Sequence, residues 1–330
     1  MSTFRSFLPM PKKTSVPVEL PKVICVVGPT SSGKTDLGVR IAQTCDGEII
    51  NADSRQIFKG FDIGTGKPEG KRATFAGHRA FLYQDVPHYL MDFLDPREQF
   101  TVAEWREKAL LAIQGIAKRG HLPIVVGGTG LYIKSLVDNL LFPKIEPKPE
   151  LRKAFEAKPL DELVKLLLKL DPDAVHSVDL KNPRRVIRAL EVATFTGKPF
   201  TAQKKIGQPV INAFQVGIQR PRDELYARID AAVDLMMERG WPEEIRQAEK
   251  KGIPASAPAM TSIGYRELSN YIKGEESLER AVELTKRSVR RYAKRQESWF
   301  KRDKRIHWCQ NAYEAVDAAR EWLNAGGFAA

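Results

Sequence analysis

The sequence predicts an α/β fold in which a mostly parallel sheet carries a phosphate-binding loop and an all-helical unit is inserted. Apolar runs typical of buried strands alternate with helical patterns, which is the order of a parallel α/β sheet. The first run, VICVV, leads into GPTSSGKT, which has the G-x-x-x-x-G-K-T spacing of a P-loop. Strand signals then stop between about Leu140 and Asn212. We therefore expect a P-loop NTPase-like core with an inserted helical domain.

Strands and helices follow one another along the core. The expected strands are residues 23–27, 48–52, 123–126 and 214–218. The first helix follows the loop, and the clearest covers residues 102–119, where Thr101 and Glu104 form a capping box and Gly120 is a terminator. We expect two further long helices, over residues 226–250 and 278–302. Ligands of such a sheet bind at the carboxyl ends of its strands.

The inserted unit has its own helical signals. An apolar-rich helix is expected around residues 160–170, and a second helix begins after the cap Asn182, with Pro183 in its first turn and Gly197 at its end. The segment PKIEPKPE reads as a linker. We therefore assign residues 22–139 and 213–330 to the catalytic core and 140–212 to the inserted domain. Residues 1–21 are proline-rich with a single arginine, which favours a disordered leader over a transit peptide.

Composition limits the class of protein and its compartment. The 330 residues are 42% hydrophobic, which supplies a globular core. No apolar run approaches the length of about 18 residues that a membrane helix needs. The three cysteines have neither disulfide-framework nor zinc spacing, and the five histidines are scattered without a metal or nucleophile pattern. We expect a cytoplasmic protein that acts as a monomer, without a membrane.

Positive charge is concentrated in one late segment. The net charge is +12, and residues 280–305 contain eleven Lys or Arg against three Asp or Glu. Arg287, Arg291 and Arg295 repeat every four residues, with Tyr292 and Trp299 among the apolar residues of the other side. This density suits a nucleic acid, although a solvated helix face would have the same pattern.

Two strand ends carry side chains with possible chemistry. Asp53 and Ser54 follow the second strand, where a carboxylate could bind Mg²⁺ through water or accept a proton; a simple turn-forming pair is the alternative. Thr129 follows the third strand after two glycines that permit close backbone approach or make a tight turn. In the inserted helix, Arg185 and Arg188 could contact phosphate, although Arg188 could pair with Glu191 instead.

Taken together, these motifs resemble the tRNA dimethylallyltransferases, also called tRNA isopentenyltransferases. The family's order and spacing are matched by GPTSSGKT, DSRQIFKGFDIGTGKP, HYLMDFLDP, LPIVVGGTGLYIKSL, NPRRVIRALEV, RPRDELYARID, SIGYRELSNYIKGE and KRSVRRYAKRQESWF. The resemblance covers about residues 22–308 and implies transfer of a dimethylallyl group from dimethylallyl diphosphate to the exocyclic amine of the adenosine just 3′ of the anticodon. It also implies that the inserted domain grips the tRNA anticodon stem-loop.

The resemblance implies roles for individual residues. Asp53 would take the proton from the adenine amine, and Thr129 would contact the reacting centre. The diphosphate, or a nucleotide such as ATP, would lie in the loop formed by Gly28, Pro29, Thr30, Ser31, Ser32, Gly33, Lys34 and Thr35, with Mg²⁺ near Thr35. The tRNA contacts would fall on Asp53, Ser54, Arg55, Gln56, Ile57 and Phe58; on Arg184, Arg185 and Arg188; on Gly264, Tyr265 and Arg266; and on Lys286, Arg287, Arg290, Arg291, Lys294, Arg295 and Gln296.

The sequence departs from the family pattern at four positions, and three other functions compete with the resemblance. The departures are Arg55, Glu267, Val289 and Arg291, which bear on RNA contacts. The spacing of a C-terminal zinc finger is absent from the sequence, which favours a bacterial type. The competing functions are an adenylate isopentenyltransferase, which the basic segment argues against, a P-loop kinase, and a non-catalytic RNA-binding NTPase.

Overall fold

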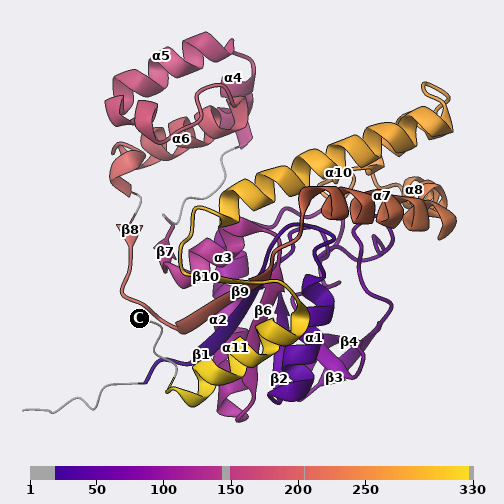
Figure 1. Ribbon diagram of the computed structural model, residues 1–330. Coiled ribbons are helices and arrows are strands. Elements are labelled where there is room, and N and C mark those ends of the chain that lie inside the picture. Colours follow the sequence, from indigo (N-terminus) through magenta and orange to yellow (C-terminus); the bar gives the residue numbers. More distant parts are fainter. Residues whose placement is uncertain (1–18, 143–148, 204, 327–330) are drawn as a thin grey trace, which may run out of the picture.

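The protein is built around an eight-stranded sheet, shown in Figure 1. The computed structural model describes residues 19–142, 149–203 and 205–326. The strands of this sheet are β1 (Lys22–Val27), β2 (Gly47–Asn51), β3 (Lys71–Phe75), β4 (His78–Tyr83), β5 (Val86–Tyr89), β6 (Leu122–Gly127), β9 (Asn212–Ile218) and β10 (Ile306–Cys309). Their order is β10-β9-β1-β6-β2-β5-β4-β3. Pairing is parallel from β10 to β5, and β4 and β3 are antiparallel.

All four expected strands are confirmed, but their arrangement was only partly predicted. In the sheet β6 lies between β1 and β2, with Ile24 aligned to Ile124 and Ile124 to Ile49. The sequence analysis also missed β3, β4, β5 and β10. β3 is largely exposed, β4 begins with two exposed polar residues, and β5 contains a proline, so none of them has the long β-branched run of β1.

Helices cover both faces of the sheet. They are α1 (Lys34–Thr44), α2 (Val102–Lys118), α3 (Gly130–Val137), α4 (Pro149–Glu156), α5 (Leu160–Leu170), α6 (Pro183–Thr196), α7 (Arg222–Glu238), α8 (Trp241–Lys250), α9 (Tyr265–Ile272), α10 (Leu278–Phe300) and α11 (Ala312–Asn324). Short 3₁₀ helices cover Pro172–His176 and Thr201–Gln203. Alternate residues of β1 enter two cores: Val23 and Cys25 pack with residues of α2 and α3, while Ile24 and Val26 pack with those of α1 and α11.

The capping signals of the core are confirmed. The Thr101 hydroxyl accepts a hydrogen bond from the Glu104 amide at 3.2 Å, and Glu104 Oε2 accepts one from the Thr101 amide at 2.7 Å. Gly120 follows α2 with φ 84°, a conformation that favours glycine. The fixed start of α2 places Trp105 under the sheet, where its indole nitrogen donates to Asn51 O at 2.9 Å.

The inserted segment forms a small helical layer that Figure 1 shows apart from the sheet. Helices α4, α5 and α6 have their own apolar core, which includes Phe155, Leu167 and Leu190. As predicted, Asn182 caps α6 and Gly197 ends it in the left-handed conformation. The segment is not strand-free, because β7 (Leu140–Leu141) pairs with β8 (Lys205–Ile206) at its base. The boundaries 140 and 212 stay a prediction.

Part of the predicted linker and leader cannot be compared with the structure. Residues 143–148 of the linker lie outside the described residues, and Pro149 and Glu150 begin α4. Residues 1–18 of the leader also lie outside the described range.

A third helical layer lies over the carboxyl ends of the strands. Figure 1 shows α10 and α7 side by side above the sheet, with α8 next to them. The expected helix 226–250 is two helices, because Gly240 has φ 89° and starts α8 anew. Trp241 and Tyr265 are fully buried between α8, α9 and the loop after β2. This layer brings the basic residues of α10 to the edge of the sheet that carries the phosphate loop.

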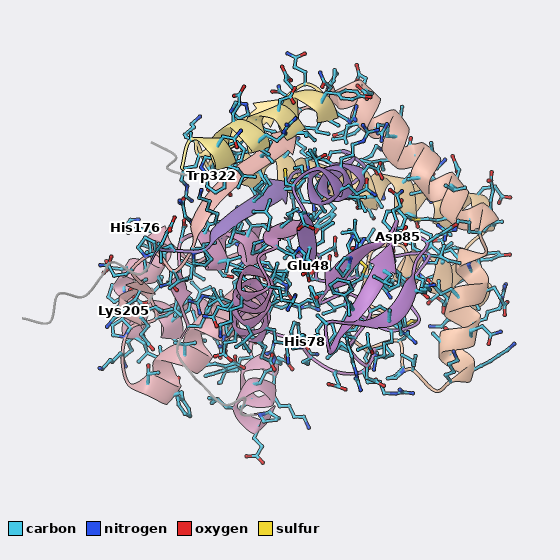
Figure 2. All side chains as sticks on the ribbon, turned by 90° about the horizontal axis from the view of Figure 1, so that it is seen from below. Glu48, His78, Asp85, His176, Lys205 and Trp322 are labelled. Carbon is cyan, nitrogen blue, oxygen red and sulfur yellow. The ribbon has the colours of Figure 1, made fainter. Side chains whose placement is uncertain are left out.

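Figure 2 shows the molecule from the opposite side of this layer. His176 and Lys205 of the inserted segment lie at the left of the view, and Asp85, between β4 and β5, lies at the right. Glu48, on β2, lies between them and is buried, with Arg119 Nη2 2.7 Å from its Oε2.

Candidate active site

The phosphate loop connects β1 to α1 in the conformation that its glycines permit. Gly28 has φ 138° and Gly33, the cap of α1, has φ 97°. A Cβ atom on Gly28 would lie 3.3 Å from Ser32 Oγ, so the glycine leaves room for that hydroxyl. Ser32 Oγ is buried and has no hydrogen-bond partner in the described structure. A buried, unpartnered hydroxyl in such a loop is suited to a phosphate oxygen.

Lys34 is the charged group of the loop. Its Nζ donates to Pro29 O at 2.6 Å. Burial lowers the pKa of Lys34 to about 8, and the Asp53 carboxylate acts in the opposite direction. The strands that lead to Lys34 and Asp53 are not neighbours, because β6 lies between them, yet the Asp53 carboxylate is close enough to influence the pKa of Lys34.

Residues from the second half of the chain hold the phosphate loop from outside. Arg220 Nε donates to Ser32 O at 2.8 Å, and Arg228 Nε donates to Ser31 O at 2.9 Å. Both arginines follow β9, at its end and on α7. The sequence analysis missed them, and the only signal was their place in the motif RPRDELYARID.

The strand ends of β2 and β6 meet at Ser54 and Thr129. Thr129 Oγ1 accepts a hydrogen bond from the Ser54 amide at 3.0 Å, and the Thr129 amide donates to Ala52 O at 3.1 Å. A Cβ on Gly127 would lie 2.2 Å from Ala52 O, so the glycine permits this close approach. Asp53 and Thr129, the two predicted catalytic residues, therefore lie on two loops, after β2 and after β6, which these hydrogen bonds hold together.

Asp53 is held by its neighbours. Its Oδ1 accepts a hydrogen bond from the Arg55 amide at 2.8 Å, and its own amide donates to Asn51 Oδ1 at 3.1 Å. The side chain is half-buried, so it is accessible to a substrate. A fixed and accessible carboxylate is suited to accept a proton.

A buried tyrosine of α3 and a half-buried tyrosine of α10 are also close enough to Asp53 for its charge to act on them. Burial raises the pKa of Tyr292 of α10, and the Asp53 carboxylate raises it further. Burial also raises the pKa of Tyr132 of α3, with Asp53 again contributing. Tyr132 stacks on Trp105 with ring centroids 4.5 Å apart. The sequence analysis assigned Tyr292 only to the packing side of its helix.

A buried ion-pair network supports the loop that follows Asp53. Lys67 Nζ lies 2.6 Å from Asp92 Oδ1 and 2.7 Å from Asp62 Oδ1, and it also donates to Phe58 O. The Lys67 and Asp92 side chains are 1% and 4% exposed. The Asp92 amide donates to Gln56 O at 2.9 Å, so the network joins residues 56–58 to the segment after β5.

The predicted RNA residues separate into three sets by exposure and pairing. Arg266, Arg287, Arg291 and Lys294 are exposed, and no ion pair is found for them among the described residues. Arg295 is exposed and lies over the Tyr292 ring, 5.7 Å from its centroid.

In the second set, the cations are paired with acids. On α10, Lys286 lies 2.6 Å from Asp234 and Arg290 donates to Asp230 Oδ2 at 2.7 Å, which attaches the helix to α7. On α6, the exposed Arg185 lies 3.9 Å from Asp179 and the exposed Arg188 lies 3.5 Å from Glu191, whereas Arg184 is exposed and no ion pair is found for it among the described residues.

The third set is buried and offers RNA no side-chain surface. Ile57, Phe58 and Tyr265 belong to the core between α8, α9 and the loop. Gly264 is buried beside Trp241, whose ring lies 2.1 Å from where a Cβ would be. Gln296 is 5% exposed and bonds to backbone atoms of the site. These side chains support the site in the structure, and their contact with RNA stays a prediction.

Two of the four departures have internal partners. Arg55 Nη1 donates to Pro258 O at 2.9 Å, which joins the turn after Asp53 to the segment before α9. Glu267 accepts from the Gly264 amide and from Ser288 Oγ, both at 3.0 Å, so it caps α9 and fastens it to α10. Gln56 likewise donates to Gly66 O at 3.0 Å.

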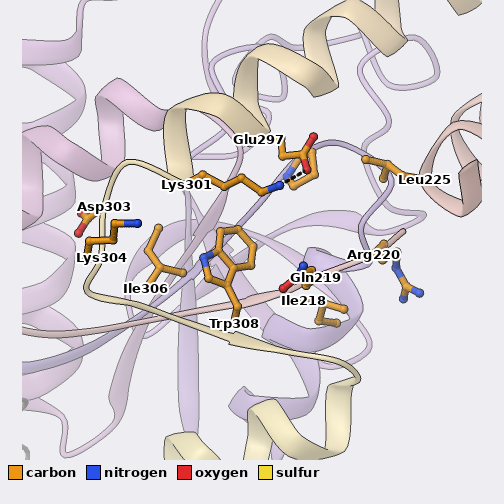
Figure 3. A pocket seen from close by; sticks show the side chains of 11 residues that line it. Ile218, Gln219, Arg220, Leu225, Glu297, Lys301, Asp303, Lys304, Ile306 and Trp308 are labelled. Atoms are coloured by element: carbon orange, nitrogen blue, oxygen red, sulfur yellow. Dashed lines mark ion pairs between the residues drawn. The ribbon is translucent and has the colours of Figure 1, made fainter. Parts of the chain in front are cut away.

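A cavity of about 320 Å³ lies beside the phosphate loop and shares Pro29 with it. Figure 3 shows Trp308 and Ile306 on its floor and Arg220 at its edge. Lys301 also lines it and pairs with Glu297 at 2.7 Å, as the dashed line marks. The cavity therefore combines apolar surface with positive charge next to the loop.

Oxygen ligands for a divalent cation are limited to a few side chains of the site. Where the chain is described, no three His, Cys, Asp or Glu side chains gather into a metal-holding group. Mg²⁺ is usually held by one or two protein oxygens together with substrate phosphates and waters. The Thr35 hydroxyl on the first turn of α1 and the Asp53 carboxylate near Lys34 are donors of this kind.

Comparisons with known proteins agree with this geometry. The sequence model of the family "IPP transferase" matches residues 56–303, and that of "Isopentenyl transferase" matches residues 21–86. A tRNA dimethylallyltransferase of Acetivibrio thermocellus is 42% identical over 293 residues, which are 87% of this chain and 90% of the relative.

Solved structures are similar over most of the chain. The full-length tRNA isopentenylpyrophosphate transferase of Bacillus halodurans is 34% identical, with a TM-score of 0.65 over 93% of this chain and 96% of the other. A eukaryotic dimethylallyltransferase acting on tRNA is 27% identical, with a TM-score of 0.75 over 93% of this chain and 80% of the other. Within the described residues, no helix has the length and apolar content to cross a membrane.

Proposed function

The chain belongs to the IPP transferase family, and from that premise we propose that it transfers a dimethylallyl group from dimethylallyl diphosphate to tRNA. The acceptor is the exocyclic amine of the adenosine just 3′ of the anticodon, and diphosphate leaves. The observation that carries the proposal is that the loops of Asp53 and Thr129 are joined by the hydrogen bond from the Ser54 amide to Thr129 Oγ1, and that Gln296 connects Gly128 of this pair to Thr30 of the phosphate loop.

The phosphate loop and its cations bind the leaving diphosphate. Backbone amides of residues 28–35 and the Lys34 ammonium surround its oxygens, and Ser32 Oγ offers a further donor. Arg220 and Arg228 keep the loop in shape and add positive charge. Stabilising negative charge as it develops on the leaving group lowers the barrier to breaking the allylic carbon–oxygen bond.

Asp53 acts as the base and Thr129 orients the turn. The adenine amine attacks the allylic carbon, the carbon–oxygen bond breaks towards the diphosphate, and the amine proton passes to the Asp53 carboxylate. Thr129 fixes the Ser54 amide through its hydroxyl and so sets the direction of Asp53. A general base held in this way contributes about 10²–10⁴ to the rate.

Thr35 and Asp53 are the residues that would hold Mg²⁺ together with the diphosphate oxygens. The bound ion supplies charge neutralisation at the diphosphate. Because the Arg55 amide holds Oδ1 of Asp53, the remaining oxygen Oδ2 is the one that would accept from the substrate amine or from a metal-bound water.

RNA binds across the exposed cations of α10 and α6. Arg287, Arg291 and Lys294 face solvent on α10, and Arg184, Arg185 and Arg188 face it on the inserted helices. These charges neutralise phosphates, so they set affinity and its salt dependence. The target base must leave the stack of the anticodon loop to reach Asp53, at a cost of a few kcal/mol. We place the reaction in the cytoplasm, with the enzyme acting as a monomer.

The test is a transfer assay with two acceptors. Purified protein is mixed with Mg²⁺, dimethylallyl diphosphate labelled in the prenyl carbons, and either unmodified tRNA or AMP. Label in tRNA is expected. Label in AMP alone would instead identify an adenylate isopentenyltransferase, the second candidate, which the match of residues 21–86 to the isopentenyl transferase family favours. ATP hydrolysis without label in either acceptor would point to a P-loop kinase or NTPase.

A further inference from the structure

Gln296 joins α10 to both glycine-containing loops of the site. Its Oε1 accepts a hydrogen bond from the Thr30 amide at 2.9 Å, and its Nε2 donates to Gly128 O at 2.8 Å. The donor and the acceptor of one side-chain amide are thus both used by backbone groups, and this pairing fixes which end of the amide is oxygen. We propose that Gln296 is a positioning residue through which RNA binding on α10 strengthens diphosphate binding in the phosphate loop. The inference rests on the proposed function, which supplies the two ligands.

Gly128 has no side chain, which allows the Gln296 amide to approach its backbone closely. A Cβ on Gly128 would lie 2.2 Å from Gln296 Nε2, well inside contact distance. Gly128 is not among the glycines with positive φ, so backbone conformation does not require glycine there. The close approach of Gln296 is therefore the reason that a side chain is excluded at this position.

The contact lies on the face of α10 opposite to its RNA-facing cations. Ala293 and Phe300 are buried with Gln296, while Arg291 and Lys294 are exposed. A helix moves as a unit over one turn, so a shift of the exposed face on RNA binding also moves the Gln296 amide. Because Thr30 lies within residues 28–35, that movement reaches the diphosphate site directly.

The other side chains that hold the loop do not belong to α10. Arg220 and Arg228 follow β9, and Lys34 belongs to the loop's own helix. In the part of the chain that the structure describes, Gln296 is the residue of α10 whose side chain bonds to the loop backbone. Removing its hydrogen bonds should leave the loop assembled but disconnect it from the RNA helix.

The experiment measures the coupling between two bound ligands without any reaction. The dissociation constant of inorganic pyrophosphate with Mg²⁺ is measured by calorimetry with and without a saturating anticodon stem-loop RNA. The wild-type protein is expected to bind pyrophosphate about fivefold or more tightly when RNA is bound, and by linkage to bind RNA more tightly by the same factor when pyrophosphate is bound.

Three variants remove the contact in different ways. Gln296→Asn is one methylene too short to reach both partners, and Gln296→Glu keeps the acceptor but sets an oxygen against Gly128 O. Gly128→Ala displaces the amide from the other side. In each variant, bound RNA should change the dissociation constant of pyrophosphate by no more than roughly twofold. The affinity for RNA without pyrophosphate should stay within about threefold of the wild-type value. Ser298→Ala, exposed on the same helix, should keep the wild-type coupling.

Several outcomes would overturn the assignment. Coupling that is absent in the wild type, or unchanged in Gln296→Asn and Gly128→Ala, would do so. If the Gln296 variants bound RNA, in the absence of pyrophosphate, as weakly as Arg291→Gln does, Gln296 would be an RNA contact instead. Failure of all three variants to fold would show a structural requirement and not a coupling one. Coupling is measured on the unreacted complex, so a missing prenyl transfer would contradict the proposed function and leave this result standing.

Discussion

The Thr129 hydroxyl oxygen accepts a hydrogen bond from the Ser54 amide at 3.0 Å, which joins the carboxyl ends of β6 and β2. The two residues are 75 positions apart in the sequence. Asp53, the neighbour of Ser54, therefore has its direction set by a residue of another strand. Holding a catalytic carboxylate in the reactive orientation raises the rate, because the base and the substrate then need not reach that geometry by chance.

Replacing Asp53 by Asn should abolish proton acceptance and leave the shape of the turn intact. We expect kcat to fall by about 10²–10⁴. RNA binding should be retained, because the side chain is held by the Arg55 amide and not exposed on the basic face. Single-turnover transfer and RNA binding measured on the same preparation test this. Full activity of Asp53→Asn would remove Asp53 from the mechanism.

Replacing Thr129 by Val removes the acceptor of the Ser54 amide while keeping the volume of the side chain. The unpaired amide should lower the free energy of unfolding by about 1–3 kcal/mol. The kcat should fall as well, because Asp53 loses its fixed direction. Thr129→Ser keeps the hydroxyl and should restore both quantities. Chemical denaturation and initial rates provide the measurements, and equal rates for Val and Ser would contradict the orienting role.

Lys34 should make diphosphate binding depend on pH. Its pKa is lowered by burial to about 8, so the ammonium is present below that pH and lost above it. Pyrophosphate should therefore bind more weakly as the pH rises past about 8, although a bound anion moves the midpoint upward. Lys34→Arg stays charged and should show no such change between pH 7 and 9, as calorimetry across this range can establish. A flat wild-type profile would contradict the shift.

The buried pair of Lys67 and Asp92 should be important for stability. Replacing Lys67 by Met leaves the Asp92 carboxylate buried with only the Arg72 side chain beside it. Loss of one partner of a buried pair costs about 3–5 kcal/mol. Thermal unfolding of Lys67→Met, Asp92→Asn and the double variant gives the coupling energy. Additive effects in the double variant would mean that the two groups act independently.

The exposed cations of α10 should determine the salt dependence of RNA binding. Arg287→Gln and Arg291→Gln should each weaken binding and reduce the slope of log K against log salt by about one. Arg280→Gln is the charge-matched control, because Arg280 lies on the same helix but pairs with Glu283 at 2.7 Å. Binding of the stem-loop at several salt concentrations decides between an RNA face and a solvated one. Identical slopes for all three variants would favour the solvated face.

The sequence predicted the parts of the site that are local in the chain. These parts are the phosphate loop, the cap at Thr101 and the strand ends at Asp53 and Thr129. Each depends on the spacing of residues close together in the chain, which the sequence shows directly. Arg220 and Ser32 are 188 residues apart in the chain, and Gln296 and Thr30 are 266 residues apart. No local pattern predicts contacts between residues so distant in sequence.

The arrangement of strands was also beyond local patterns. The place of β6 between β1 and β2 is a property of how strands pair. The orientation of Gln296 could not be predicted from the local sequence either. Its position among basic residues of α10 predicted an RNA contact, whereas the helix turns it inward to Gly128. Charge along a segment identifies a basic helix, but its packing decides which side chains reach a partner.

The most direct test of the central claim is to locate the transferred group. Unmodified tRNA with three adenosines at the 3′ side of the anticodon is incubated with the protein, Mg²⁺ and dimethylallyl diphosphate, digested, and analysed by mass spectrometry of the anticodon-loop fragments. The account predicts one five-carbon prenyl group on the exocyclic amine of the adenosine just 3′ of the anticodon, and none with Asp53→Asn. An unmodified loop, or a prenyl group found only on added AMP, would contradict it.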